Sequence, residues 1–275
     1  MNFYFVYDEY TDIVDVSTAS TISQSVIDVM HHPGAELSDP TDILAGMIKD
    51  FCLRTRTLAP LSSSGFMRFR DTMKAYFEAV AEEAQIRASN NILPFDEYMP
   101  FRRDISAGLP TLIFTELGLD LPDYVTSHPV ISALMDDAVD LIVFVNDLHS
   151  YQREIASGHA SSNILPVIMK ENNLDLQAAL DWLGVHCNQT ISRFLANVQK
   201  VPSWGAEIDE KVKTYIEGMG QWVRGNDDWS HQSKRYYGDE GPMIKATRII
   251  TLDMNRVARS YLKQLDRSRG GFATM

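Results

Sequence analysis

The sequence is poor in cysteine and has no long apolar run. Cys52 and Cys187 are its only cysteines, so the chain needs no disulfide framework and suits a reducing compartment. No apolar run reaches the length of a membrane span, and the first residues lack the basic and apolar regions of a secretory signal. These absences predict a cytoplasmic protein with no transmembrane segment.

Positive charge is also scarce. The chain has 25 Lys and Arg against 37 Asp and Glu, a formal net charge of −12. Such a charge argues against a nucleic-acid-binding surface; it suits a protein that binds metal ions, but also many proteins that do not. The 275 residues are enough for one large domain or two small ones.

Strand patterns are missing as well, whereas helical periodicity runs through the chain. We therefore expect an all-α single domain. The expected helices lie at residues 8–30, 43–54, 65–91, 95–117, 129–157, 161–172, 175–199 and 206–224. The helix at 95–117 should break or kink at "SAGLP", because this stretch contains Gly108 and Pro110.

The end of the chain has the opposite charge. From Pro242 onward, seven Lys or Arg stand against two Asp, a local charge of +5. We interpret residues 239–275 as a basic C-terminal tail, a solvated helix with a frayed end. Contact with a partner or a membrane is the alternative.

The strongest polar pattern is "NDLHSYQRE", residues 146–154. Asn146, Ser150 and Glu154 are spaced by four, so on a helix they form one stripe. An amide oxygen, a hydroxyl and a carboxylate together suit a hard cation such as Mg²⁺. The apolar run at 141–145 places the preceding turn in the core. Spacing alone equally allows a helix end that reaches solvent, with Glu154 paired to Arg153 or a neighbour.

A second acidic pattern, "DEYTD", lies near the start of the chain. Asp8 and Asp12 are four residues apart and therefore share one helical face. Two carboxylates in that arrangement can bridge divalent cations. The alternative is acidic decoration of a helix N-terminus, which the helix dipole favours.

The segment "DDAVD" fits an Asp-Asp-x-x-Asp pattern better than "DEYTD" does. It lies on the same expected helix as Asn146, however, and Asp140 points in a different direction from Asn146. The two halves of a metal clamp must face each other. We therefore interpret Asp136, Asp137 and Asp140 as a solvated helix face.

Two basic segments are candidate phosphate ligands. "PFRRDISAG" contains Arg102 and Arg103, and "WSHQSKRYYG" contains Lys234, Arg235 and Tyr236. Arginine binds phosphate with a planar fork of donors, and a tyrosine hydroxyl adds another. Taken separately, each segment fits a surface charge cluster equally well.

In their order and spacing, "DEYTD", "RRDISAG", "NDLHSYQRE" and "RYYG" resemble a class I terpene synthase of the fungal, basidiomycete-type sesquiterpene cyclase group. The resemblance covers about residues 3–238 and includes "LPDYVTSHP" and "VPSWG". It implies a class I terpenoid synthase helical bundle around a central apolar cavity. Residues 1–238 would form the α-domain, apparently without the helices that precede the acidic motif in the family.

The resemblance also assigns roles to the polar motifs. Three Mg²⁺ ions and the prenyl diphosphate that they bind would be held by Asp8, Asp12, Asn146, Ser150 and Glu154. Arg103 matches the diphosphate-sensing arginine, with Arg102 as a second candidate. Ser106, Ala107 and Gly108 would form the kink that couples sensing to ionisation.

The remaining implied roles concern the substrate. Arg153, Arg235 and Tyr236 would bind diphosphate oxygens. Phe5 and Trp229 are expected cavity-wall residues, because aromatic faces stabilise a carbocation. For Phe144, ordinary core packing is the better interpretation. Asp8, Arg103 and Gly108 are the expected catalytic residues.

The implied reaction is the Mg²⁺-dependent ionisation and cyclisation of farnesyl diphosphate to a sesquiterpene, with release of diphosphate. This is the work of a carbon–oxygen lyase of secondary metabolism. One alternative is a truncated, non-catalytic paralogue that binds diphosphate or a partner. Another is a synthase for geranyl or geranylgeranyl diphosphate. A chain-elongating prenyltransferase is disfavoured, because such enzymes usually have two Asp-rich motifs. Homodimers occur in the family.

Overall fold

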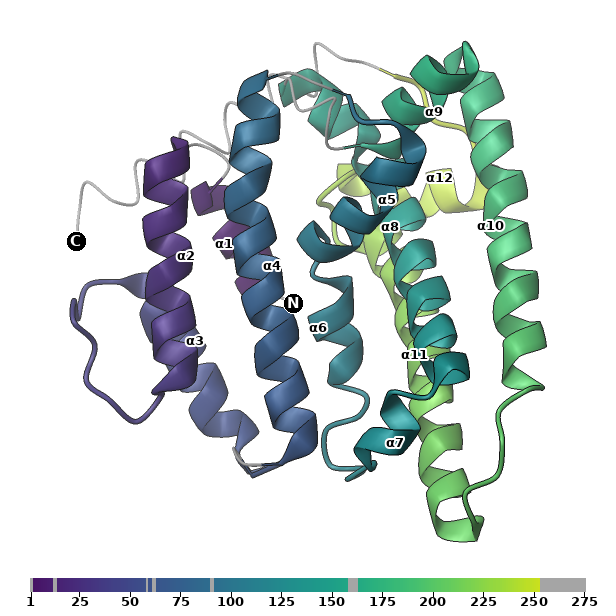
Figure 1. Cartoon of the computed structure of the whole chain (residues 1–275). Coiled ribbons are helices and arrows are strands. Elements are labelled where there is room, and N and C mark those ends of the chain that lie inside the picture. The colour runs from purple at the N-terminus through teal and green to yellow at the C-terminus, as the bar shows by residue number, and fades with distance from the viewer. Residues whose placement is uncertain are drawn as a thin grey trace.

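The computed structural model describes residues 2–11, 14–57, 59–60, 63–89, 92–157 and 163–252. Within these ranges the chain is all-α and contains no strand (Figure 1), which confirms the predicted fold class. The helices are α1 (Asn2–Thr11), α2 (Val16–His31), α3 (Ile43–Thr55), α4 (Ser64–Ser89), α5 (Phe95–Ile105), α6 (Gly108–Ile113), α7 (Asp123–Thr126), α8 (Pro129–Ser157), α9 (Ile164–Asn172), α10 (Leu176–Val198), α11 (Ala206–Gln232) and α12 (Gly241–Thr247), with a short 3₁₀ turn, η2 (Gly238–Glu240), before the last.

The helix expected at 8–30 is two helices. Asp15 caps α2, since its carboxylate accepts a hydrogen bond of 2.8 Å from the backbone N–H of Thr18. Such a cap satisfies a backbone donor that a helix start would otherwise leave unpaired, and it favours a new helix over continuation of the old one. The prediction of one continuous helix was wrong for this reason.

Two apolar clusters form the core. One lies among α8, α9, α10 and α11, and the other lies among α1, α2, α3 and α4. Helix α8 is the central element of the first cluster, because it contacts α5, α6, α9, α10 and α11 (Figure 1). Phe144 on α8 is 1% exposed within this cluster, so its interpretation as a core residue is confirmed.

The break predicted at "SAGLP" is present between α5 and α6. Ala107 adopts a left-handed conformation with φ of 55°. The Ser106 hydroxyl donates to the Arg103 carbonyl at 2.9 Å and accepts from the Gly108 N–H at 3.0 Å. A Cβ on Gly108 would lie 3.1 Å from a methyl group of Val139, so α6 approaches α8 closely at this point.

The interpretation of "DDAVD" as a solvated face was wrong for two of its residues. Asp137 and Asp140 are 3% and 4% exposed, and only Asp136 reaches solvent. Asp137 accepts from Arg193 of α10 at 2.6 Å, and Asp140 accepts from Arg103 of α5 at 2.6 Å. The two carboxylates are buried because α8 is covered on this side by both neighbouring helices.

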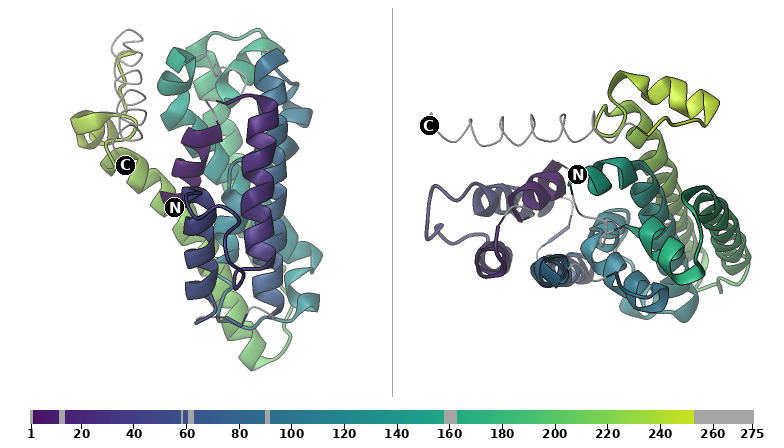
Figure 2. Two further views of the ribbon diagram at one scale, coloured as in Figure 1. Left: turned by 90° about the vertical axis from the view of Figure 1, so that its left-hand side faces the viewer. Right: turned by 90° about the horizontal axis from the view of Figure 1, so that it is seen from above.

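The C-terminal part of the described chain lies at the rim of the bundle. Helix α12 packs on the end of α11, and both views of Figure 2 place it at the edge of the molecule. Residues 253–275 lie outside the described ranges, so the predicted basic tail and the domain boundary at 238 stay predictions. No helix in the described ranges combines the length and the apolarity needed to cross a membrane.

Candidate active site

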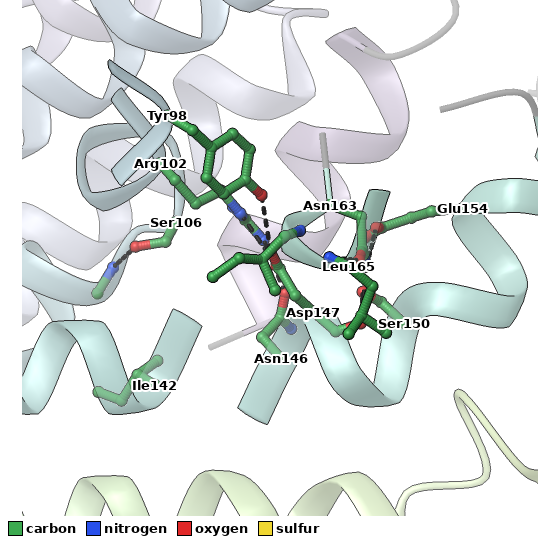
Figure 3. Close-up of polar contacts among 12 residues, drawn as sticks. Tyr98, Arg102, Ser106, Ile142, Asn146, Asp147, Ser150, Glu154, Asn163 and Leu165 are labelled. Carbon is green, nitrogen blue, oxygen red and sulfur yellow. Dashed lines mark hydrogen bonds and ion pairs between the residues drawn. The ribbon is translucent and has the colours of Figure 1, made fainter. Parts of the chain in front are cut away.

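The polar stripe on α8 lies inside the bundle, where α5, α9 and the segment after α11 meet it. Asn146 connects two of these elements, and Figure 3 shows it beside Arg102 of α5. Its side-chain oxygen accepts from Arg102 Nη2 at 2.9 Å, and its amide nitrogen donates to the Tyr236 hydroxyl at 3.0 Å. Ser150 is 4% exposed. Asn146 and Glu154 are half-buried, so the middle of the stripe is removed from solvent and its two ends are partly exposed.

Asp147 is the residue on which most of these contacts converge (Figure 3). Its side chain is fully buried and accepts hydrogen bonds from the Tyr98 hydroxyl at 2.7 Å and from Arg102 Nη2 at 2.6 Å. It also accepts from the backbone N–H of Ile164 at 2.8 Å. One carboxylate thus fixes α5 and the first turn of α9 to α8. The sequence signal was an acid two residues after the apolar run 141–145, which the motif assignment overlooked.

Glu154 lies at the end of the stripe. Asn163, the N-cap of α9, donates to its carboxylate at 2.8 Å. Burial raises the pKa of Glu154 to about 7; the charge of Asp147 adds to the shift, and Arg102 opposes it. Water does not solvate this carboxylate well, and a bound cation would favour its charged form.

The first acidic motif faces the stripe from α1. Burial and the neighbouring carboxylate of Glu83 raise the pKa of Asp8, while the charges of Arg235, Arg153 and Arg102 oppose that rise. These three arginines come from the segment after α11, from α8 and from α5. Asp8 therefore lies in the same electrostatic environment as the stripe. Asp12 lies outside the described residues.

Glu9 is a second acidic residue of α1 that the sequence analysis did not assign. Its Oε1 lies 3.5 Å from Arg235 Nη1 and 3.9 Å from Arg153 Nη2. Arg153 and Arg235, two of the expected diphosphate ligands, thus lie next to the same carboxylate of α1. The sequence signal for Glu9 was its position inside "DEYTD". Adjacent residues of a helix point about 100° apart, so Glu9 does not share the face of Asp8.

The two arginines of α5 have different surroundings. Arg102 is buried and points to Asn146 and Asp147. Arg103 instead forms two hydrogen bonds with Asp140, of 2.6 and 2.9 Å, on another side of α8. The structure thus brings the second candidate for diphosphate sensing to the stripe and pairs the first candidate elsewhere.

The expected cavity-wall residues lie beneath Arg235. The Phe5 and Trp229 rings stack with centroids 5.1 Å apart, and the Arg235 guanidinium lies 4.3 Å from the centroid of Phe5. Among the described residues, no hydrogen-bond partner reaches the buried Nε of Arg235. A buried donor without a partner is rare in folded proteins and fits a site for a bound anion.

The donor set matches the groups that the resemblance implies. Asp8, Asn146, Ser150 and Glu154 offer oxygen atoms alone, the chemistry that Mg²⁺ prefers. Arg102 and Arg235 offer guanidinium donors beside them, with Tyr236 bonded to Asn146. A divalent cation with a phosphate anion therefore suits this arrangement.

Comparison with known proteins agrees with this chemistry. The family described as "Terpene synthase family 2, C-terminal metal binding" matches residues 1–193. Sesquiterpene synthase Agr8 of Cyclocybe aegerita is 45% identical over 251 residues, which cover 91% of this chain and 71% of that protein. Delta(6)-protoilludene synthase 18 of Postia placenta is 36% identical, over 97% of this chain and 76% of its own length.

Solved structures show the same fold. A protein from ancestral sequence reconstruction is 26% identical with a TM-score of 0.68, and the match covers 78% of this chain but only 61% of that one. Germacradien-4-ol synthase from Streptomyces citricolor has a TM-score of 0.68 over 84% of this chain and 75% of its own, at 20% identity, which supports the fold alone.

These matches cover the motifs from which the resemblance was drawn. The matched family is described by its metal-binding region, in agreement with the oxygen-bearing side chains that line α8 and α1. The chain belongs to the terpene synthase family, and it is an enzyme of the terpene synthase class with sesquiterpene synthases among its relatives.

Proposed function

We propose that this protein is a sesquiterpene synthase that uses Mg²⁺ to ionise farnesyl diphosphate and then cyclises the carbocation. The observation that carries the proposal is the contact of the buried Arg102 with Asn146, at 2.9 Å, at the start of the stripe of oxygen-bearing side chains. The sesquiterpene synthases among the relatives support the class of product.

The metal ligands in this proposal come from two helices. Asn146, Ser150 and Glu154 would hold Mg²⁺ on α8, and Asp8 would hold it on α1; Asp12 stays a predicted ligand. When bound, the ions stabilise the negative charge that develops on the leaving diphosphate. The resemblance implies three ions, a number that metal analysis of the substrate-bound protein would establish.

Arginine and tyrosine side chains bind the diphosphate. Arg235 has a buried Nε available for an anion, and Arg153 shares Glu9 with it. An incoming diphosphate competes with Glu9 for both guanidinium groups. Tyr236, bonded to Asn146 at 3.0 Å, adds a hydroxyl beside the metal ligands.

We assign diphosphate sensing to Arg102 in place of Arg103. Arg102 bonds to Asn146 of the stripe as well as to Asp147, whereas the Nε and Nη2 of Arg103 are directed at Asp140 on another side of α8. The kink after Arg103 connects the end of α5 to the start of α6. The Ser106 hydroxyl donates to the Arg103 carbonyl and accepts from the Gly108 N–H. A shift of α5 at Arg102 is thereby transmitted to α6.

The test is incubation of the purified protein with farnesyl diphosphate in the presence of Mg²⁺ or EDTA, followed by gas chromatography–mass spectrometry. We expect cyclic sesquiterpenes that disappear with EDTA and in the double variant Asn146→Ala with Glu154→Ala. Gln189→Ala, at an exposed position of α10, is the matched control and should retain activity.

Three other outcomes would change the assignment. Product from geranyl or geranylgeranyl diphosphate alone would keep the enzyme and replace its substrate. Absence of product from folded protein with all three substrates would favour a non-catalytic relative. Unchanged product in the double variant would refute the metal site. A cytoplasmic location and a homodimer are further proposals, to be tested by cell fractionation and analytical ultracentrifugation.

A further inference from the structure

Two buried histidines and an aspartate meet where α8 contacts the end of α11. Asp227 and His231 are four residues apart on α11 and share one face, and His149 approaches them from α8. His149 and His231 are 4% and 3% exposed. One ring nitrogen of each histidine and one carboxylate oxygen of Asp227 all lie within 4.8 Å of one another. None of these residues belongs to the proposed magnesium site.

The spacing of these atoms is close to that of ligands on one ion. Asp227 Oδ1 lies 3.1 Å from His149 Nε2 and 3.6 Å from His231 Nδ1. Ligands at the usual zinc distances of about 2.0–2.1 Å in a tetrahedron stand about 3.3 Å apart. An ion can therefore enter with side-chain adjustments alone.

His149 also has the outer partner that metal-binding histidines use. Its Nδ1 is 2.7 Å from the Tyr237 hydroxyl, which fixes the ring and directs Nε2 toward Asp227. Hydrogen bonds at the second nitrogen orient ligating imidazoles and strengthen their binding. His231 Nδ1 lies 2.9 Å from the backbone carbonyl of Asp227, a contact that it would exchange for the ion.

The ligand types select the metal. Two imidazoles and one carboxylate suit Zn²⁺ and related first-row transition ions, whereas the oxygen-only stripe on α8 suits Mg²⁺. The side chain of Asp227 is 26% exposed, which leaves an approach for the ion and for a water as fourth ligand. We propose that His149, Asp227 and His231 bind one Zn²⁺ ion that fastens α11 to α8.

The position of this site gives the ion a structural consequence. The Tyr236 ring stacks on His149 with centroids 6.1 Å apart, and Tyr237 bonds to the same imidazole. A Cβ on Gly241 would lie 1.8 Å from the His231 carbonyl, so the start of α12 rests directly on this cluster. Zinc bound here stabilises the segment from α11 to α12, which contains Arg235 and Tyr236.

The test is metal binding, without reference to activity. Protein freed of metal by a chelator is titrated with ZnCl₂ by calorimetry in buffer that contains excess Mg²⁺, and with Co²⁺ while the visible spectrum is recorded. We expect one ion per chain, a tetrahedral Co²⁺ absorption band and a raised melting temperature with Zn²⁺. His32→Gln, at an exposed histidine, is the control and should bind like the wild type.

Variants of the cluster separate a metal site from a metal-free hydrogen-bond network. His231→Gln should abolish the Co²⁺ band, and Tyr237→Phe should weaken Zn²⁺ binding by about tenfold or more through the lost outer contact. Circular dichroism verifies that each variant is folded. Wild-type protein that binds no zinc under these conditions, or zinc binding that is equal in wild type and His231→Gln, would overturn the proposal.

Discussion

Arg102 and Asp147 form an ion pair in which Nη2 and Oδ1 are 2.6 Å apart and the side chains are 9% and 0% exposed. Tyr98 and the backbone N–H of Ile164 satisfy the other carboxylate oxygen. Few ion pairs in the bundle are so completely removed from water. Because the pair is buried, water cannot solvate either charge if its partner is removed, and the loss of one partner should therefore destabilise the fold.

Replacement of Asp147 by alanine should therefore lower the free energy of unfolding by about 3–5 kcal/mol, because Arg102 would be left buried without its counter-charge. Chemical denaturation monitored by circular dichroism measures this change. Asp50→Ala is the matched control: its pair with Arg54 is exposed on both sides and should contribute less than about 1 kcal/mol. Equal losses in the two variants would contradict the structural role of Asp147.

Arg102→Lys and Arg103→Lys should differ in their kinetics. Lysine keeps the charge but loses the planar fork that binds carboxylate and phosphate. At Arg102 we expect the rate of diphosphate release to fall by about a hundredfold, the order found when one donor to a developing anion is removed. At Arg103, which bonds to Asp140, the change should be small. Single-turnover measurement of released diphosphate tests this; a larger loss at Arg103 would reverse the assignment.

The stability of metal-free protein should depend on Glu154. Its pKa is about 7 in the folded protein against an ordinary value of 4.5, so the folded state holds the proton more tightly than the unfolded state. The associated stability is present below pH 4.5 and is lost as the pH rises to about 7, by about 3 kcal/mol at most. Unfolding in EDTA at pH 5 and pH 7.5 should show this loss in the wild type and a smaller one in Glu154→Gln.

Gly108→Ala should destabilise the kink. The added methyl group would lie 3.0 Å from Ser106 Oγ and 3.1 Å from a Val139 methyl group, so α6 must move away from α8. Overpacking of this kind costs about 1–3 kcal/mol. Gly46→Ala is the control, because its Cβ meets nothing within 4 Å and alanine is favoured inside a helix by about 0.5–1 kcal/mol. The melting temperature should fall in Gly108→Ala and rise in Gly46→Ala.

The sequence predicted the helices well where apolar periodicity was continuous, as in α8 and α10. It did not predict the separation of α1 from α2, because apolar periodicity does not reveal the cap in which the Asp15 carboxylate accepts a hydrogen bond from the Thr18 N–H. It also ended α11 too early, at residue 224. The polar turn that follows stays helical because Arg224 pairs with Asp228 at 3.1 Å and Asp227 bonds to His149.

For the site, spacing by four was enough to place Asn146, Ser150 and Glu154 on one stripe of α8, of which only Ser150 is fully buried. Spacing could not decide between Arg102 and Arg103, because adjacent residues of a helix point about 100° apart and only the packing of α5 on α8 selects one of them. The partners of Asp147 come from other helices, and no local pattern encodes that approach. The roles assigned to the metal and diphosphate ligands stay predictions.

Neighbouring residues of α8 have different roles: one lies at the proposed site, and the next holds the surrounding helices together. Asn146 faces Arg102 and Tyr236, whereas the next residue, Asp147, ties α5 and α9 to the helix. The insertion or deletion of one residue in the apolar run before them would rotate both by about 100°. An insertion would move Asn146 into the position of Asp147, and a deletion would move Asp147 into the position of Asn146. The number of residues along this helix is therefore constrained more strictly than their identity. Sequence variation in this part of the chain must proceed by substitution, without insertion or deletion.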